Sequence, residues 1–167
     1  MLGLGLGGSD GGFGLRACRI GHGGEARLPL QALRGEFVDA AGDRLTILDT
    51  RKTTPTFRLL EKYAVRCGGG KNHRMGLYDA VLIKENHIAA AGGLTAAFRA
   101  AQALKAPVAF IQVEVETLKQ LQEALDAGVT MVLLDNMDLP TLREAVRTAN
   151  GRCSLEISGG VTLEGLR

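Results

Sequence analysis

Five short apolar runs recur along the chain, and stretches with helical spacing separate them. The runs are LTILD at 45–49, AVLI at 80–83, VAFIQV at 108–113, MVLL at 131–134 and SLEI at 154–157. Apolar β-type runs that alternate with helical patterns are typical of βα units around a parallel sheet. The pattern therefore predicts an α/β protein, an incomplete (β/α) barrel with parallel strands inside and helices outside.

The segments between the runs place apolar residues on one helical face. They predict helices at 28–41, 55–66, 94–105, 117–127 and 139–149, and a further helix beginning as the chain reaches Arg167. Thr54 and Pro55 have the order of an N-cap and a first-turn proline, and Thr117 with Gln120 has the spacing of a capping box. Glycines at the ends of several segments predict where the helices stop.

The first 24 residues differ from the rest in composition. They contain ten of the 23 glycines and show no hydrophobic period, and a glycine-rich chain loses much entropy on ordering while burying little. We therefore expect a flexible tail at 1–24 and a barrel domain at 25–167. A misplaced start or a shifted reading frame is a second explanation of this segment. Its GLGLGG motif lacks the preceding strand and the βαβ unit of a dinucleotide-binding turn.

Five strands close a barrel poorly, because closure ties the number of strands to their tilt and stagger. The sheet edge beside 153–157 would then be unpaired, which is a liability in a free monomer. A missing final strand, a partner chain or an incomplete gene would each explain this pattern.

Composition and charge exclude several kinds of protein. The net charge of +2, the 4% aromatic content and the lack of tryptophan argue against a nucleic-acid partner. The three cysteines are odd in number and far apart, as expected for reduced thiols in a cytoplasmic protein rather than for disulfides or a zinc site. No apolar stretch approaches the roughly 20 residues of a membrane span, so no membrane partner is expected.

Residues able to handle charge lie at the end of each apolar run. They are Arg51 and Lys52, Lys84, Glu114, Asp135, and Ser158 with Gly159 and Gly160. In barrels of βα units the chemistry takes place at the carboxyl ends of the strands. Arginine offers a fork for carboxylates, lysine a point charge for phosphate, and a glycine turn its backbone N–H groups. Together these residues predict a pocket for an anionic, phosphorylated substrate.

Plainer interpretations stay open for several candidates. His73 and Arg74 follow a glycine run and could bind an anion, although a single histidine is often a structural hydrogen-bonding residue. Glu114 could form a structural bridge with Lys84 rather than act on a substrate. Glu116 lies on the same side of the strand as Glu114, so either acid could be the functional one.

Six segments occur in the order RKTTP, GGGKNHR, LYDAVLIKENHI, VEVE, VLLDN and SGG. Together they resemble nicotinate-nucleotide pyrophosphorylase, also called quinolinate phosphoribosyltransferase, over about 45–167. The resemblance implies a magnesium-dependent pentosyltransferase of NAD biosynthesis. Such an enzyme transfers the phosphoribosyl group of phosphoribosyl pyrophosphate (PRPP) to quinolinate with decarboxylation, giving nicotinate mononucleotide, pyrophosphate and CO2. It also implies an N-terminal sandwich domain before the barrel, and a homodimer whose neighbouring subunit completes the active site.

The resemblance further implies a role for each cationic candidate. Arg51, His73 and Arg74 would hold the two carboxylates of quinolinate. Lys84 would lie between quinolinate and the PRPP side, and Lys52 would meet the pyrophosphate.

On the ribose side, the resemblance implies that Glu114 and Asp135 face the sugar and steady an oxocarbenium-like transition state. These two acids and the lysine between the substrates would be the catalytic groups. Mg²⁺ would arrive with PRPP near the acids, with no certain metal ligand in the protein. Ser158, Gly159 and Gly160 would cradle the 5′-phosphate.

Three features depart from the family pattern. The sandwich domain with its arginine and the family's final strand have no counterpart here, and Thr56-Phe57 replaces the usual Gly-Leu after RKTTP. The alternative function is therefore a catalytically inactive, truncated remnant that acts at most as a ligand-binding or dimerisation module. A third candidate is a molybdenum-locus relative with the same fold and a different acceptor, although KENH at 84–87 favours the quinolinate branch.

Overall fold

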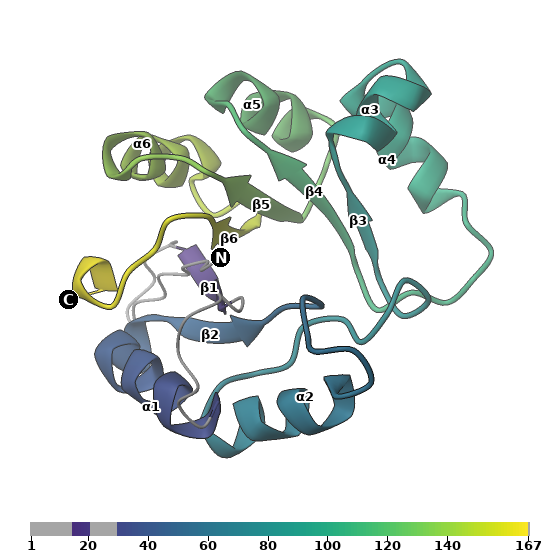
Figure 1. Ribbon diagram of the computed structural model, residues 1–167. Coiled ribbons are helices and arrows are strands. Elements are labelled where there is room, and N and C mark those ends of the chain that lie inside the picture. Colours follow the sequence, from purple (N-terminus) through teal and green to yellow (C-terminus); the bar gives the residue numbers. More distant parts are fainter. Residues whose placement is uncertain (1–14, 21–29, 167) are drawn as a thin grey trace.

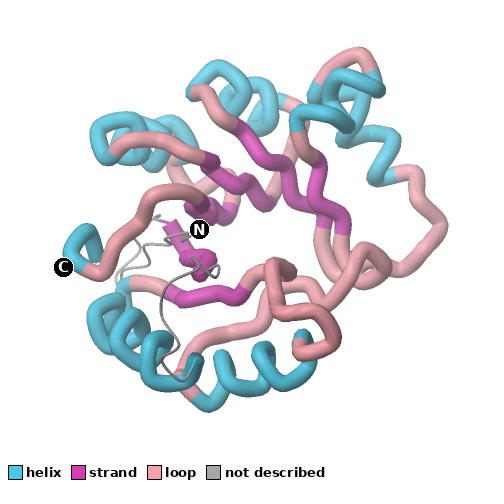
Figure 2. Tube along the Cα trace, viewed as in Figure 1, coloured by secondary structure: helices cyan, strands magenta, loops and turns pink. Residues whose placement is uncertain are grey.

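The computed structural model describes residues 15–20 and 30–166. The strands are Leu15–Ile20 (β1), Thr46–Asp49 (β2), Val81–Ile83 (β3), Ile111–Val115 (β4), Met131–Asp135 (β5) and Ser154–Ser158 (β6). They pair in parallel in the order β2-β1-β6-β5-β4-β3. The sheet curls, and helices cover its outer side (Figure 1, Figure 2). The predicted α/β fold with a parallel sheet is confirmed.

The five predicted helices are present in the described chain. The α-helices are Leu30–Ala41 (α1), Arg58–Cys67 (α2), Glu85–Ala91 (α3), Leu94–Gln102 (α4), Leu118–Asp126 (α5) and Leu139–Ala149 (α6), with 3₁₀ turns at Gly42–Arg44 (η1) and Glu164–Leu166 (η2). The predicted capping box is confirmed, because Gln120 N–H donates to Thr117 Oγ1 at 3.2 Å and Thr117 N–H donates to Gln120 Oε1 at 3.1 Å.

The sequence pattern does not predict α3. This helix is only seven residues long, and its sequence, ENHIAAA, has no broad apolar face. Lys84 caps it, and the Lys84 N–H donates to His87 Nδ1 at 3.0 Å. A local cap therefore begins a helix that hydrophobic spacing alone does not reveal.

The expectation of an unstructured tail at 1–24 is wrong at Leu15–Ile20, which forms β1. This strand pairs with β2 on one side and with β6 on the other. Without β1, strands β2 and β6 would each present unpaired backbone groups. Hydrogen bonding to both strands therefore offsets the entropy lost when this short segment becomes ordered, despite the glycines around it. The sheet thus has six strands rather than five, and the edge beside β6 is covered. The rest of 1–24 lies outside the described residues, and the division into tail and domain stays a prediction.

Side chains that alternate along each strand separate into two sets. One set packs with the helices in the main apolar core, and its strand members are Ile47, Ile83, Val113, Val115, Val132, Leu134, Leu155 and Ile157. The helices contribute Leu94, Phe98, Leu121 and Leu142 to the same core. Burial of each large apolar side chain contributes roughly 1.5–3 kcal/mol. This outer layer therefore holds the sheet to its helices.

The other set lies on the inner side of the curled sheet, because neighbouring side chains in a strand point to opposite faces. Its buried members are Leu48, Leu82, Gln112, Glu114, Leu133, Glu156 and Ser158. Buried polar and charged groups are costly unless they are hydrogen-bonded or paired. An inner layer with so many polar side chains therefore contributes little to stability and indicates a functional site.

The segment between α2 and β3 runs along the β2 edge of the sheet. Lys71 N–H donates to Ile47 O at 2.8 Å, and the N–H groups of Met75 and Gly76 donate to the Asp79 carboxylate at 2.6 and 2.9 Å. Burial raises the pKa of Asp79, but backbone hydrogen bonds and the charge of Lys62 together lower it by more, so the pKa lies below its usual value. The segment that carries His73 is thus fixed at both ends.

The turn before α2 differs from its prediction. Thr54 and Pro55 do not cap the helix, which begins at Arg58. The Thr54 N–H instead donates to Glu61 Oε1 at 3.1 Å, and Arg58 Nε donates to Thr53 Oγ1 at 3.3 Å. These contacts hold the turn in a non-helical conformation, so the helix begins three residues after Pro55.

Thr56 has a φ of 70° in this turn, a left-handed conformation that β-branched residues disfavour by roughly 1–2 kcal/mol. We expect Thr56→Gly to raise the free energy of unfolding by about 1 kcal/mol in a denaturant titration. The matched control, Thr148→Gly within α6, should lower it by about 0.5 kcal/mol, because glycine is unfavourable inside a helix. A loss of stability in both variants would contradict the proposed strain at Thr56.

Candidate functional site

A lysine and a glutamate meet at the carboxyl ends of β3 and β4. Ile83 pairs in register with Val113, so the next residues, Lys84 and Glu114, are neighbours. Lys84 Nζ donates to both carboxylate oxygens of Glu114, at 2.7 and 2.6 Å. The Glu114 side chain is 7% exposed and that of Lys84 is 43% exposed. The ion pair thus has a buried acid and a cation that reaches solvent.

Glu116 does not share this position. It is exposed, and its N–H donates to Gln120 Oε1 at 2.9 Å, beside the cap of α5. Of the two acids left open by the sequence, Glu114 is therefore the one that lies in the inner layer. Glu114 and Lys84 do form the ion pair that the sequence left open, and its geometry is compatible with both a structural and a functional role.

The ends of β5 and β6 also lie side by side. Asp135 pairs in register with Ser158, and Asn136 connects them. Asn136 N–H donates to Ser158 O at 2.8 Å, and Asn136 Nδ2 donates to Asp135 Oδ2 at 2.8 Å. An acid and a hydroxyl therefore stand at adjacent strand ends, as predicted from the sequence.

The turn after β6 requires glycine. Gly159 has a φ of 99° and Gly160 a φ of 68°, and a Cβ atom on Gly159 would collide with Asn136 Oδ1. The further helix expected as the chain reaches Arg167 appears in the described chain as the 3₁₀ turn Glu164–Leu166, several residues after Gly160. A phosphate here would therefore be bound by the turn itself and not by the N-terminus of a helix.

We expect Gly159→Ala to lower the free energy of unfolding by about 2 kcal/mol or more, because it combines left-handed strain with a collision against Asn136. Gly128→Ala is the matched control. Gly128 has a similar φ of 84° but open space around it, so its substitution should cost only about 1 kcal/mol. Thermal unfolding measures both. Equal losses would show that Asn136 does not press on Gly159.

Arg51 lies just beyond the end of β2. Its Nε is buried and has no hydrogen-bond partner within the described chain, while its backbone oxygen accepts from Arg58 Nη2 at 3.2 Å. A buried charged donor without an acceptor costs roughly 1–3 kcal/mol or more. A bound carboxylate would remove that cost. Lys52, by contrast, is exposed to solvent.

His73 and Arg74 follow the glycine run at 68–70. The His73 side chain is 5% exposed, and its Nε2 lies 3.5 Å from Glu156 Oε2. Its ring meets the Phe110 ring edge-on, with 4.9 Å between the ring centroids. Arg74 Nη1 donates to Ala80 O at 3.2 Å. The burial of His73 gives weight to the structural interpretation of this histidine, alongside the anion-binding one.

Sequence reasoning missed a buried charged pair beneath this site. Lys62, on α2, is 1% exposed and donates to Asp49 Oδ1 at 2.5 Å and to His73 O at 3.0 Å. Asp49 Oδ1 also accepts from the His73 N–H at 2.9 Å. The available signal was a lysine in the middle of an amphipathic helix, on the face that otherwise packs inward.

Gln112 and Glu156 were missed as well. Both are buried within strands, and Gln112 Nε2 donates to Glu156 Oε2 at 2.7 Å across the inner side of the sheet. The signal was a polar residue in an otherwise apolar run, two positions before a predicted site residue. Alternation places Gln112 with Glu114 and Glu156 with Ser158 on the same side of their strands.

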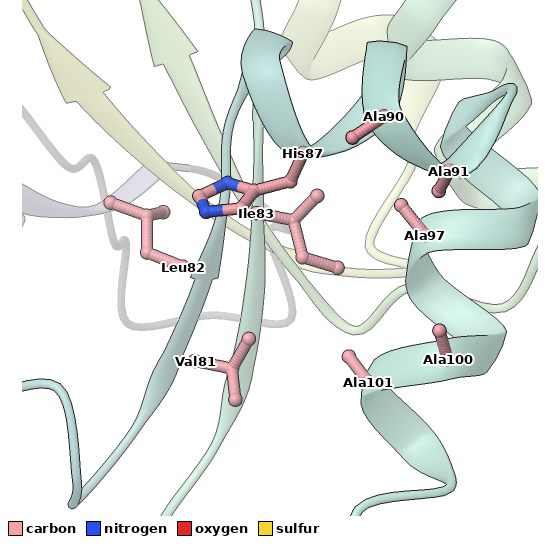
Figure 3. A pocket seen from close by; sticks show the side chains of 9 residues that line it. All are labelled: Val81, Leu82, Ile83, His87, Ala90, Ala91, Ala97, Ala100 and Ala101. Carbon is pink, nitrogen blue, oxygen red and sulfur yellow. The ribbon is translucent and has the colours of Figure 1, made fainter.

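An open hollow of about 390 Å³ lies beside β3, where this strand meets α3 and α4. Figure 3 shows that its lining comes from the aliphatic side chains of β3 and the alanines of α3 and α4, with His87 at one end. It contains neither lysine nor arginine. This apolar hollow does not suit a phosphorylated ligand.

The described residues have three further properties that bear on their chemistry. No group of three or more metal-ligating side chains occurs among the described residues. Burial raises the pKa of Cys153 to about 11, so this thiol stays protonated near neutral pH and is a poor nucleophile. None of the described helices combines the length and apolar character that a membrane crossing requires.

The fold and the strand-end residues define a class of protein, an α/β fold whose curled parallel sheet carries charged and polar side chains at the carboxyl ends of its strands. The family described as "Quinolinate phosphoribosyl transferase, C-terminal domain" matches residues 32–167. The chain belongs to the quinolinate phosphoribosyltransferase family.

Named relatives agree with this assignment. The chain is 48% identical over 124 residues to the Bacillus subtilis protein named "probable nicotinate-nucleotide pyrophosphorylase (carboxylating)", covering 74% of this chain and 43% of the relative. The structure of NadC from Streptococcus pyogenes is 43% identical, with a TM-score of 0.78, and the match covers 83% of this chain and 49% of that one. The structure of the nicotinate-nucleotide pyrophosphorylase of Ehrlichia chaffeensis is 40% identical, with a TM-score of 0.77, and the match covers 83% of this chain and 51% of that one. The chain thus spans about half the length of these relatives.

Proposed function

We propose that this chain carries the phosphoribosyl-transfer site of a quinolinate phosphoribosyltransferase. The reaction joins quinolinate to the ribose of PRPP, releases pyrophosphate and CO2, and gives nicotinate mononucleotide for NAD biosynthesis. The observation that carries this proposal is the buried Nε of Arg51, which has no acceptor within the described chain and lies at the strand ends of a family member. A substrate carboxylate would supply that acceptor.

We assign the cationic side of the site to quinolinate. Arg51 would bind one carboxylate, and His73 with Arg74 would bind the other. Lys84 suits a position between the two substrates, because Glu114 holds its ammonium group while the side chain as a whole is still 43% exposed. A ring held firmly in a dry pocket would also favour the later loss of CO2.

We assign the acidic side to the ribose. Displacement at the anomeric carbon builds positive charge on the sugar, and Glu114 and Asp135 would stabilise it. Lys52, exposed at the rim, would meet the leaving pyrophosphate. The turn of Ser158, Gly159 and Gly160 would hold the 5′-phosphate with its hydroxyl and backbone N–H groups.

Mg²⁺ fits this donor set as a companion of PRPP. Mg²⁺ prefers oxygen ligands and is commonly bound by one or two carboxylates together with substrate phosphates. Asp135 is half-buried at a strand end and suits that role, whereas both oxygens of Glu114 already accept from Lys84. The ion would neutralise charge on the leaving pyrophosphate.

We further propose a homodimer in the cytoplasm, in which the neighbouring subunit completes the site. In support, α2 exposes large apolar side chains, as does the loop before β3; they are Leu59, Leu60, Tyr63, Leu77 and Tyr78. Exposed apolar groups of this size are typical of interaction surfaces. Sedimentation of the wild-type chain against Leu60→Lys would test self-association, with a monomer expected for the variant and a monomeric wild type counting against the proposal.

A turnover assay that follows nicotinate mononucleotide tests the proposed activity. PRPP-dependent product that disappears in Lys84→Met supports it. The second candidate is an inactive ligand-binding module. That candidate predicts binding of phthalate, a dicarboxylate analogue of quinolinate, without turnover. A folded chain that neither turns over nor binds would overturn both.

A further inference from the structure

Glu156 is a buried acid that the proposed reaction does not use. It lies in the middle of β6 and is 2% exposed. Its neighbours in register are the apolar residues Leu133 on β5 and Ala17 on β1. A buried carboxyl group is retained only with polar partners nearby. Its partners therefore indicate its role.

One oxygen of Glu156 faces two polar side chains. Gln112 Nε2 donates to Glu156 Oε2 at 2.7 Å, and His73 Nε2 lies 3.5 Å from the same oxygen. Gln112 comes from β4 and His73 from the loop before β3, so the contacts span the inner side of the sheet. Phe110 meets the His73 ring edge-on, at an interplanar angle of 70°. The imidazole is therefore limited on two sides.

The backbone of His73 is fixed separately. Its N–H donates to Asp49 Oδ1 at 2.9 Å, and its carbonyl accepts from Lys62 Nζ at 3.0 Å. With the main chain held by this pair, the side chain of His73 can still rotate about its Cα–Cβ and Cβ–Cγ bonds. The contact with Glu156 restricts that rotation.

We propose that Glu156 is a positioning residue for His73: its carboxylate, itself oriented by Gln112, directs Nε2–H of the imidazole toward β6 and so fixes the ring's orientation and tautomer. A carboxylate that accepts from one ring nitrogen of a histidine is a common way to fix which nitrogen carries the proton. The consequence for ligand binding rests on the proposed function: an imidazole held in one orientation presents the same ring edge to every substrate dicarboxylate that binds.

The imidazole ¹⁵N spectrum of the full chain tests the proposal without any ligand. We expect His73 to carry its proton on Nε2 in the wild type. In Glu156→Gln the neutral side chain can donate as well as accept, so the His73 ¹⁵N shifts should change toward a tautomer mixture. Glu116→Gln, an exposed acid at the end of β4, is the matched control and should leave them unchanged. A wild-type His73 protonated on Nδ1 alone would overturn the proposal, even if no variant folds.

Ligand titrations test the consequence for binding. In Glu156→Gln the affinity for phthalate should fall roughly tenfold, as for the loss of a single hydrogen bond to a charged group, while the affinity for Mg²⁺-PRPP should change less than about twofold. Equal losses for both ligands would indicate a general structural defect and overturn the positioning role. If wild type does not bind phthalate, the proposed function fails, and the ¹⁵N spectrum still decides the role of Glu156.

Discussion

Lys62→Met should lower the free energy of unfolding by about 3–5 kcal/mol, because it leaves a buried carboxylate without its cation. Lys62 and Asp49 have side-chain exposures of 1% and 3%, so water cannot replace the lost partner. The Lys62 ammonium also donates to His73 O, which ties α2 to the loop that carries a proposed substrate-binding residue. Denaturant titration measures the effect.

Two variants make this result specific. Lys119→Met changes an exposed lysine on α5 and should alter stability by less than about 0.5 kcal/mol. The double variant Lys62→Met/Asp49→Leu should recover part of the loss, since removing both charges leaves no isolated ion. If the double variant were less stable than the single variant by the full cost of a second buried defect, the ion pair would not be the source of the effect.

Lys84→Met should weaken the binding of phthalate and of Mg²⁺-PRPP by about 10- to 100-fold each, the loss expected when a hydrogen bond to a charged group worth roughly 1.5–3 kcal/mol disappears. Lys84 is the one proposed contact shared by both substrates, so both affinities should fall. Because its side chain is 43% exposed, its contribution to folding stability is screened by solvent. Calorimetric titration of each ligand measures the change.

The control for this variant is Lys105→Met, an exposed lysine after α4, which should bind both ligands as the wild type does. A Lys84→Met chain with unchanged affinity for both ligands would support the plainer interpretation, in which Lys84 and Glu114 form only a structural bridge.

The fold could be predicted where periodicity is strong. The apolar runs and amphipathic segments gave β2 to β6 and five of the helices, since burial of one face imposes a period of two or of 3.6. The strand β1 escaped prediction because glycines surround it, and its stability depends on two neighbours that are distant in sequence. The short helix α3 escaped because its start depends on a local cap rather than on an apolar face.

The site could be predicted where topology alone places residues together. Parallel strands bring their carboxyl ends to one edge, so Lys84 beside Glu114 and Asp135 beside Ser158 followed from the order of elements. The buried contacts that support these site residues could not be predicted from the order of elements. The pairing of Gln112 with Glu156 crosses the inside of the sheet between residues 44 apart, and such contacts depend on how the strands curl, which no local pattern specifies.

The central claim is that the carboxyl ends of the parallel strands together bind a dicarboxylate and a phosphoribosyl group side by side. Backbone amide shifts during titration of the wild-type chain test it most directly. Phthalate should shift the amides of Arg51, His73, Arg74 and Lys84, and Mg²⁺-PRPP should shift those of Glu114, Asp135, Ser158, Gly159 and Gly160. Shifts scattered over the helices, or none at all in a folded chain at millimolar ligand, would contradict the claim.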